Sequence, residues 1–296
     1  MQKVALRSIA MNRPKFSDTR PRQTLSDFLS QASEQWPKPQ SFDQTLLKTA
    51  IVFVLMGTLL LSINGLQTGF FTLQMLSKML PAIIWEHLSF MGDTLVMLTL
   101  ALLLAYRYPH LLFALLLTAL VGTLITHGIK FWLMTPRPPA VLEPGTFQLI
   151  GSSITKKSMP SGHTLTAFAA AGLLTRLTTN HAYQWLILIA AAFIGWSRVA
   201  VGVHWPADVC MGAAGGLLSA WIGLKLADRW LPIFGKGFFL TLLSIHIGCA
   251  IALTSYDGGF PHTWIFAVAA SAISLAILYQ SFSAGQLLPT FNLRRR

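Results

Sequence analysis

The run HLLFALLLTALVGTLITHGIKFWL, residues 110–133, is the clearest guide to the fold class of this chain. Its only Lys, Arg, Asp or Glu residue is Lys130, close to the end of the run. A helix that crosses the hydrocarbon core of a bilayer needs about 20 mostly apolar residues. The run is long enough, so we predict a membrane-spanning helix over His110–Leu133.

Seven further apolar runs lie before and after this one. The chain is 53% hydrophobic and only 11% charged, which argues against one large soluble domain. The other predicted spans are Leu46–Ile63, Leu88–Tyr106, Ser161–Leu177, Trp185–Ala200, Val209–Leu226, Gly237–Thr254 and His262–Tyr279. We therefore predict an all-α, polytopic transmembrane bundle of eight helices, with Gln67–Ile83 as an interfacial or re-entrant stretch.

The basic residues are distributed as in a membrane protein. Formal net charge is +12, yet most of the 22 Lys and Arg lie in the tails and between apolar runs. They are not gathered into a nucleic-acid-binding domain, so we predict no nucleic-acid partner. The positive-inside rule then places both ends in the cytoplasm. In the N-terminal tail, one helical face is apolar and predicts a short helix on the membrane surface, formed by Leu25, Phe28, Leu29, Ala32 and Trp36.

Three short motifs fall at predicted helix ends on the outer face. The first is Lys130 followed, after six residues, by Arg137-Pro138, and the second is Pro-Ser-Gly-His at 160–163. The third is Ser197-Arg198, followed after five residues by His204 and after three more by Asp208. All three motifs are expected to face the same side of the membrane.

These motifs, in this order, resemble the three-part signature of the type 2 phosphatidic acid phosphatase superfamily. The resemblance implies a six-helix membrane core, a histidine nucleophile, a second histidine as acid, and metal-independent hydrolysis. It covers residues 46–231, which we predict to be a phosphatase core. Residues 1–45 are then a basic cytoplasmic tail, and residues 232–296 contribute two additional spans and a basic C-terminal tail.

The residues also make chemical sense individually. Lys130, Arg137 and Arg198 are three cations suited to phosphate oxygens. Ser161 is expected to cap the helix that follows it, leaving the Gly162 and His163 N–H groups free to bind an anion. Gly162, without a side chain, allows an oxyanion to approach the backbone.

The third motif supplies the nucleophile. Asp208 lies about one helical turn beyond His204, so its carboxylate can accept one imidazole N–H and leave the other nitrogen free to attack phosphorus. His163 is the expected general acid for the leaving group. We count Asp93, Pro138 and Ser197 as auxiliary candidates, Asp93 either at the site or in a structural pair with Lys130. Trp196 and Trp205 are interpreted as interfacial aromatic residues.

No carboxylate cluster suited to Mg²⁺ accompanies the motifs, so we predict neither a metal nor another cofactor. The expected partners are the bilayer and a phosphorylated lipid: phosphatidic acid, phosphatidylglycerophosphate, undecaprenyl diphosphate or a lipid A phosphate. The same pocket would also suit a lipid phosphotransferase, and a non-enzymatic lipid transporter or flippase is the remaining alternative. A bacterial inner membrane with a periplasmic site is expected, and oligomeric state stays open.

Overall fold

The computed structural model describes residues 24–284 and consists of helices joined by short segments, with no β-strand among those residues. Most of the basic N-terminal tail and the C-terminal arginines lie outside the described residues. The elements are α1 (Leu25–Glu34), α2 (Ser41–Asn64), η1 (Gly65–Gln67), α3 (Phe70–Ser77), α4 (Ala82–Met91), α5 (Thr94–Ala105), α6 (His110–Leu133), α7 (Pro138–Val141), α8 (Gly162–Thr175), α9 (His181–Ala200), α10 (Pro206–Trp230), η2 (Leu231–Ile233), α11 (Lys236–Leu253), η3 (Pro261–Thr263) and α12 (Trp264–Ala284).

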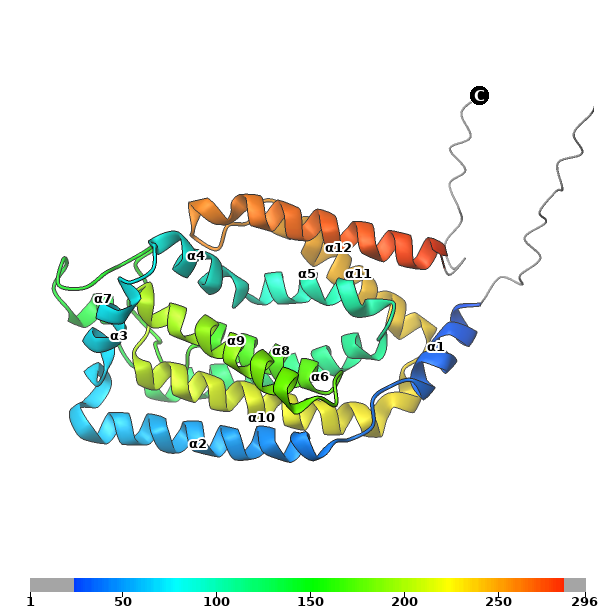
Figure 1. The fold of residues 1–296 in the computed structure, drawn as a ribbon, viewed down its shortest axis with the longest axis horizontal. Coiled ribbons are helices and arrows are strands. Elements are labelled where there is room, and N and C mark those ends of the chain that lie inside the picture. Colours follow the sequence, from blue (N-terminus) through cyan, green and yellow to red (C-terminus); the bar gives the residue numbers. More distant parts are fainter. Residues whose placement is uncertain (1–23, 285–296) are drawn as a thin grey trace, which may run out of the picture.

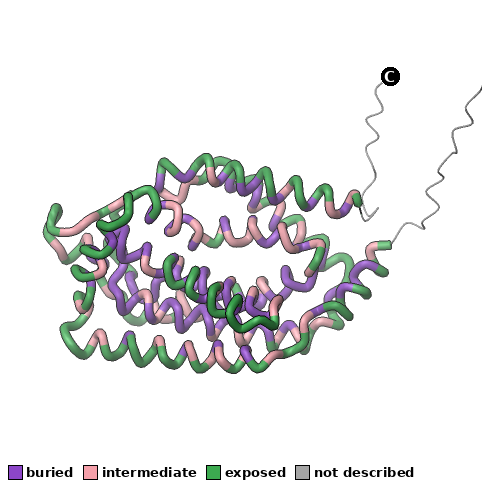
Figure 2. The backbone as a smooth tube through the Cα atoms, viewed as in Figure 1, coloured by how far each residue is buried: buried purple, intermediate pink, exposed green. Residues whose placement is uncertain are grey.

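Helix α10 is the centre of the bundle and packs against α2, α6 and α8 (Figure 1). Its small residues allow this close approach. A Cβ added to Gly212 would lie 2.6 Å from the Ser161 carbonyl oxygen, and one added to Gly172 of α8 would lie 2.5 Å from the Ala220 Cβ. Backbone contact through small residues is a common way for membrane helices to associate. Figure 2 shows the contrast between the buried α10 and the largely exposed α2.

The last two helices pack as a hairpin on the other side of the bundle. Both α11 and α12 contact α5, and Figure 1 shows them alongside it. Apolar side chains such as Ile265 and Ile273 on α12 are exposed, as on α2, where lipid would cover them. The hairpin is therefore an added layer on the face of α5.

The number of candidate spans is smaller than the sequence predicts. Six helical stretches in the described part of the chain are long and apolar enough to cross a membrane, or up to seven with the bent pair α4 and α5. The predicted span over Ser161–Leu177 contains the 14-residue helix α8, which at 1.5 Å per residue is about 21 Å long and is not among the candidate spans. Because α8 packs against α6, α9 and α10, its apolar composition reflects burial in protein.

The predicted span Leu88–Tyr106 is also not one straight helix. Helices α4 and α5 meet at an angle of 67° across Gly92 and Asp93. Asp93 has extended backbone dihedrals, and its carboxylate accepts a hydrogen bond from the Leu95 N–H at 2.8 Å. This is an N-cap, so a new helix begins there.

The stretch Gln67–Ile83 forms no candidate span in the structure. It contains the short helix α3, which contacts α9. The Gln74 amide donates hydrogen bonds to the Val199 and Ala200 carbonyls, at 2.7 and 3.2 Å, and accepts one from the Gln148 N–H at 2.9 Å. The stretch therefore braces the end of α9 against the following loop.

Helix α1 has the apolar face that the sequence predicts, but protein covers it. Phe28 stacks on Tyr106 of the α5–α6 connection at 5.2 Å and lies 5.8 Å from Phe282 of α12. Phe28, Leu29 and Ala32 are buried in this packing. The face that was expected to lie on a membrane surface is thus docked on the bundle.

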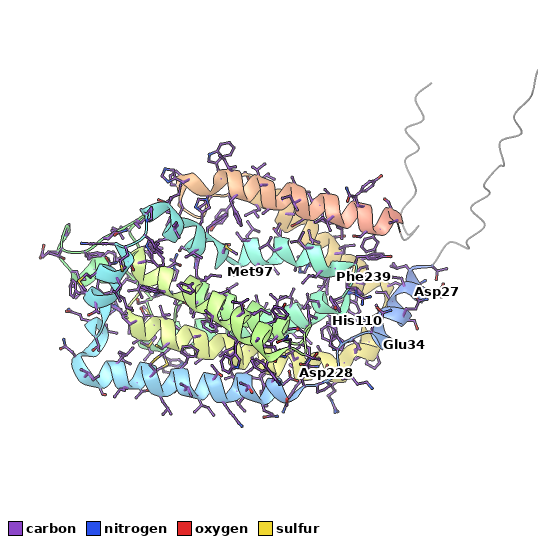
Figure 3. The ribbon with its side chains drawn as sticks, viewed as in Figure 1. Asp27, Glu34, Met97, His110, Asp228 and Phe239 are labelled. Carbon is purple, nitrogen blue, oxygen red and sulfur yellow. The ribbon has the colours of Figure 1, made fainter. Side chains whose placement is uncertain are left out.

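A buried ion cluster holds the α1–α2 connection in place. Arg176, fully buried after α8, pairs with Asp43 at 2.9 Å and Asp228 at 3.1 Å. It also donates to the Pro37 carbonyl at 3.0 Å, while the Trp36 indole donates to Asp228 at 2.9 Å. Figure 3 shows Asp228 at the same end of the bundle as Asp27 and Glu34 of α1.

Replacing Arg176 with methionine is expected to destabilise the protein strongly. Two carboxylates would lose their partner in a partly buried site, at a cost of about 3 kcal/mol. The measurement is thermal unfolding in detergent, with activity per folded molecule as a second readout. Exposed Arg229, replaced in the same way, is the control and should leave the unfolding temperature almost unchanged; equal behaviour of the two variants would contradict the expectation.

Candidate active site

The three sequence motifs meet at one end of the bundle, the end that carries α3 and α7 in Figure 1. Lys130 lies in the last turn of α6, and Arg198 lies in the last turn of α9. Gly162 and His163 begin α8, while Asp208 lies in the first turn of α10. Helix ends rather than helix centres therefore build the site.

His204 is buried and held at both ring nitrogens. Its Nδ1 lies 3.2 Å from Asp208 Oδ2, and its Nε2 lies 3.1 Å from Arg137 Nη1. A carboxylate can only accept and a guanidinium can only donate, so Nδ1 carries the hydrogen and Nε2 keeps a lone pair. That lone pair faces the cationic side of the site.

Burial is the main cause of a low proton affinity at His204. Burial first, and then the charges of Arg137, Arg198 and Lys130, hold the pKa of His204 well below its ordinary value. The imidazole is therefore neutral, which is the form that can act as a nucleophile.

The Asp208 carboxylate is positioned by more than the histidine. Its Oδ2 accepts a hydrogen bond from the Ser158 hydroxyl at 2.5 Å and one from the Trp205 N–H at 2.9 Å. Ser158 is fully buried. The sequence motifs did not indicate this residue, because its loop gives no helical spacing from which to place it. Its only signal is its position two residues before Pro160.

Arg137 is anchored to main-chain carbonyls. Its Nε donates to the Lys156 carbonyl at 2.9 Å, and its Nη1 to the Val203 carbonyl at 3.2 Å. The main chain at Arg137 is also bonded to the loop before α8, because the Arg137 N–H donates to the Thr155 carbonyl at 2.9 Å. The guanidinium is thus fixed in place without a carboxylate partner among the described residues.

The start of α8 has the features of an anion site. The Ser161 hydroxyl accepts from the Thr164 N–H and hydroxyl, at 3.5 and 2.9 Å, and the Ser161 N–H donates to the Asp208 carbonyl at 3.0 Å. The Gly162 and His163 N–H groups have no backbone partner among the described residues. A Cβ on Gly162 would lie 3.9 Å from Lys130 Nζ, so the ammonium group lies next to the start of α8.

Arg198 and Asp93 lie on the other side of His163. Arg198 is buried, and its Nη1 contacts the Ser89 hydroxyl, while its Nε has no hydrogen-bond partner within the described chain. Asp93 Oδ2 lies 3.8 Å from His163 Nε2. Asp93 therefore pairs with the second histidine, and within residues 24–284 it forms no salt bridge with Lys130.

Two auxiliary candidates and one aromatic residue make contacts within the fold. Pro138 is the buried first residue of α7, and the Ser197 hydroxyl donates to the Ile194 carbonyl of its own helix at 2.6 Å. The interpretation of Trp205 as an interfacial residue was wrong. Trp205 is fully buried, contacts Phe70 at 5.0 Å and donates to the Pro136 carbonyl at 2.9 Å.

Two cavities adjoin these residues. One, of about 290 Å³, lies between α5, α6 and α8 and is lined by His163, Gly162 and Asp93 together with His127, several threonines and apolar side chains. The other, of about 850 Å³, is almost wholly apolar, lies between α2, α6 and α10, and includes Trp132 and Met159 beside the motifs. Within residues 24–284, no group of three or more His, Cys, Asp or Glu could hold a metal ion.

Gly162→Ala is expected to impair the site while sparing the fold. The new Cβ meets only Lys130 Nζ at 3.9 Å, so it fits but occupies the space where an anion would approach. We expect about a tenfold or greater loss of kcat/KM with unchanged thermal unfolding.

Gly212→Ala is the matched comparison for this prediction. Its Cβ would lie 2.6 Å from the Ser161 carbonyl oxygen and 3.0 Å from the Thr164 Cβ, so backbone must shift. It should lower thermal stability, by about 1–3 kcal/mol. If Gly162→Ala lowered thermal stability as much as Gly212→Ala, the prediction that Gly162 serves anion binding and not packing would be refuted.

Comparison with known proteins finds a family match over part of the chain. The chain is a multi-pass membrane protein, and residues 110–231, which contain α6 to α10, match the family model of the PAP2 superfamily. This segment contains the three motifs, so the match and the resemblance seen in the motifs concern the same part of the chain.

Particular relatives follow. Over 123 residues the chain is 33% identical to an undecaprenyl-diphosphatase of Sulfolobus acidocaldarius, covering 41% of this chain and 57% of that protein. It is 40% identical over 74 residues to a lipid A 1-phosphatase of Porphyromonas gingivalis, covering 24% of this chain and 16% of that protein. The chain thus spans less than two thirds of these relatives. The crystal structure of Aquifex aeolicus LpxE aligns with a TM-score of 0.45 and 28% identity, over 49% of this chain and 85% of that one.

Proposed function

We propose that this protein hydrolyses a phosphate or diphosphate group on a membrane lipid through a phosphohistidine intermediate at His204. One observation carries the proposal. His204 Nδ1 is bonded to Asp208, while Nε2 faces Arg137 at 3.1 Å and keeps its lone pair. A neutral, oriented imidazole beside a fixed cation is suited to attack a phosphate that the same cation binds.

The reaction then has two steps. Nε2 forms a bond to phosphorus as the bond from phosphorus to the lipid oxygen breaks, and His163 gives that oxygen a proton. Asp208 stabilises the positive charge that develops on His204. In the second step a water gives a proton to His163 and attacks the phosphohistidine, which releases inorganic phosphate and restores both histidines.

The lipid nature of the substrate is supported by the larger, apolar cavity. The cavity between α2, α6 and α10 reaches Met159, next to Ser158 and the start of α8. An acyl or prenyl chain there would remain in apolar surroundings while its phosphate reached the cations. The names of the relatives favour undecaprenyl diphosphate and lipid A phosphates within this class, and phosphatidic acid and phosphatidylglycerophosphate complete the set to be tested.

We also propose that the site faces away from the cytoplasm, in the periplasm if the source is bacterial. The described chain begins with α1 and ends with α12 at one end of the bundle, and the site lies at the other end (Figure 1). With both ends of the described chain on the cytoplasmic side, the orientation agrees with the positive-inside rule.

The test is phosphate release by the purified protein in detergent from each of the four lipids, without an added acceptor. Steady release that vanadate inhibits and EDTA does not is the expected result, since vanadate mimics the transition state. Release only when an acceptor lipid is added would instead identify a phosphotransferase. Absence of release from every lipid under both conditions would refute the proposal.

A further inference from the structure

The loop between α11 and α12 reaches the candidate active site from outside the matched segment 110–231. Tyr256 in this loop donates its hydroxyl hydrogen to Asp93 Oδ2 at 2.9 Å. The same Asp93 oxygen lies 3.8 Å from His163 Nε2. One carboxylate oxygen therefore links the C-terminal hairpin to the histidine expected to act as the acid.

Asp93 is held on both oxygens. Its Oδ1 accepts the Leu95 N–H at 2.8 Å as the cap of α5, and its Oδ2 accepts the Tyr256 hydroxyl. The backbone at Gly92 also packs closely against His163, because a Cβ added to Gly92 would lie 3.0 Å from the His163 Cβ. Without Tyr256, the cap alone would leave Oδ2 free to turn toward solvent.

The loop that carries Tyr256 is docked in a defined position. The Tyr256 ring lies 6.2 Å from the Phe90 ring, and Gly258, at φ +64°, packs so closely that a Cβ would lie 2.7 Å from Phe90. On the other side, a Cβ on Gly151 would lie 2.8 Å from the Phe260 ring. The hairpin loop is thus held between the α4–α5 bend and the loop before α8.

The positive charges around the site explain why a carboxylate is needed beside His163. The positive charges of Lys130, Arg137 and Arg198 disfavour protonation of the His163 ring. A general acid, however, must carry a proton before it can donate one. Asp93 is the carboxylate that faces His163 within the described residues. Partial burial and the Asp93 carboxylate raise the pKa of Tyr256 to about 12, so its hydroxyl remains a donor.

We propose that Tyr256 is a positioning residue that holds Asp93 against His163, so that the C-terminal hairpin completes the acid side of the site. The inference rests on the proposed hydrolysis. Tyr256 does not touch the phosphate; it acts through Asp93, which favours the protonated form of His163 that the leaving oxygen needs.

The experiment compares two probes that differ in their need for a proton. Phosphatidic acid has an alkoxide leaving group that requires protonation, whereas p-nitrophenyl phosphate releases a stable phenolate without it. For Tyr256→Phe we expect kcat/KM for phosphatidic acid to fall about tenfold, since a hydrogen bond to a charged group is lost. The value for p-nitrophenyl phosphate should change less than about twofold. Asp93→Asn should show the same selectivity, and the double variant should add little to it.

Tyr279→Phe on the exposed face of α12 is the matched control and should behave as wild type with both probes. Equal losses of Tyr256→Phe on both probes, or none on either, would overturn this inference while leaving the proposed hydrolysis intact if wild type is active. A wild-type protein that releases phosphate from neither probe, nor from the other three lipids, would overturn the proposed function and this inference together.

Discussion

Replacement of His204 by asparagine is expected to lower phosphate release by at least about 10⁴-fold, because the variant has no nitrogen that can form the phosphoenzyme. Asparagine keeps a polar group near Asp208 in a buried position, so the variant should fold. With lipid radiolabelled in the phosphate, the wild-type protein should trap a label that is labile in acid and stable in base, as expected for phosphohistidine. The variant should trap none.

His181→Asn is a matched control for this prediction. His181 begins α9 at the opposite end of that helix from Arg198, and its Nδ1 contacts the Gln184 side chain at 2.9 Å. The control should retain both activity and label. Substantial turnover by His204→Asn, or a label that survives in it, would show that another residue is the nucleophile.

Replacement of Arg137 by lysine is expected to reduce kcat/KM by about 10²–10³-fold even though the charge is kept. The guanidinium uses Nε and Nη1 to bind the Lys156 and Val203 carbonyls while Nη1 also faces His204. An ammonium cannot maintain this fork, so the cation would no longer be fixed opposite Nε2. Steady-state kinetics with the best lipid substrate would measure the loss.

Arg107→Lys provides the comparison for the arginine prediction. Arg107 follows α5 and donates to the Gln35 side chain at 3.0 Å, at the end of the bundle away from the motifs. Its replacement should change kcat/KM by less than about twofold. If Arg137→Lys were equally mild, charge alone rather than geometry would explain the role of Arg137.

The fold class could be predicted from the sequence because hydrocarbon imposes a simple length requirement on apolar runs. That requirement does not distinguish a span from a helix buried in protein, so the apolar run of α8 does not by itself decide between the two. The bend at Asp93 escaped prediction for a related reason. A polar cap inside an apolar run looks like an isolated acid until its side chain is seen on the Leu95 N–H.

The site could be predicted where its residues lie at helix ends with fixed spacing. Asp208 is four residues after His204, and the structure brings the two side chains together. Ser158 and Tyr256 could not be predicted in the same way, because both come from loops whose paths depend on tertiary packing. Trp205 was misjudged since burial of an indole needs a carbonyl partner, here Pro136, that only the folded chain supplies.

The glycines and alanines along α10 have a consequence for sequence variation. In a library of all single substitutions, the Gly212 and Gly216 positions should reject even alanine, since neighbouring backbone of α8 occupies the space a Cβ would need. Exposed α2 positions such as Leu55 and Leu59 should accept most apolar residues. Tolerated substitutions would then be concentrated on the lipid-facing surface, while the small residues of α10 stay almost invariant.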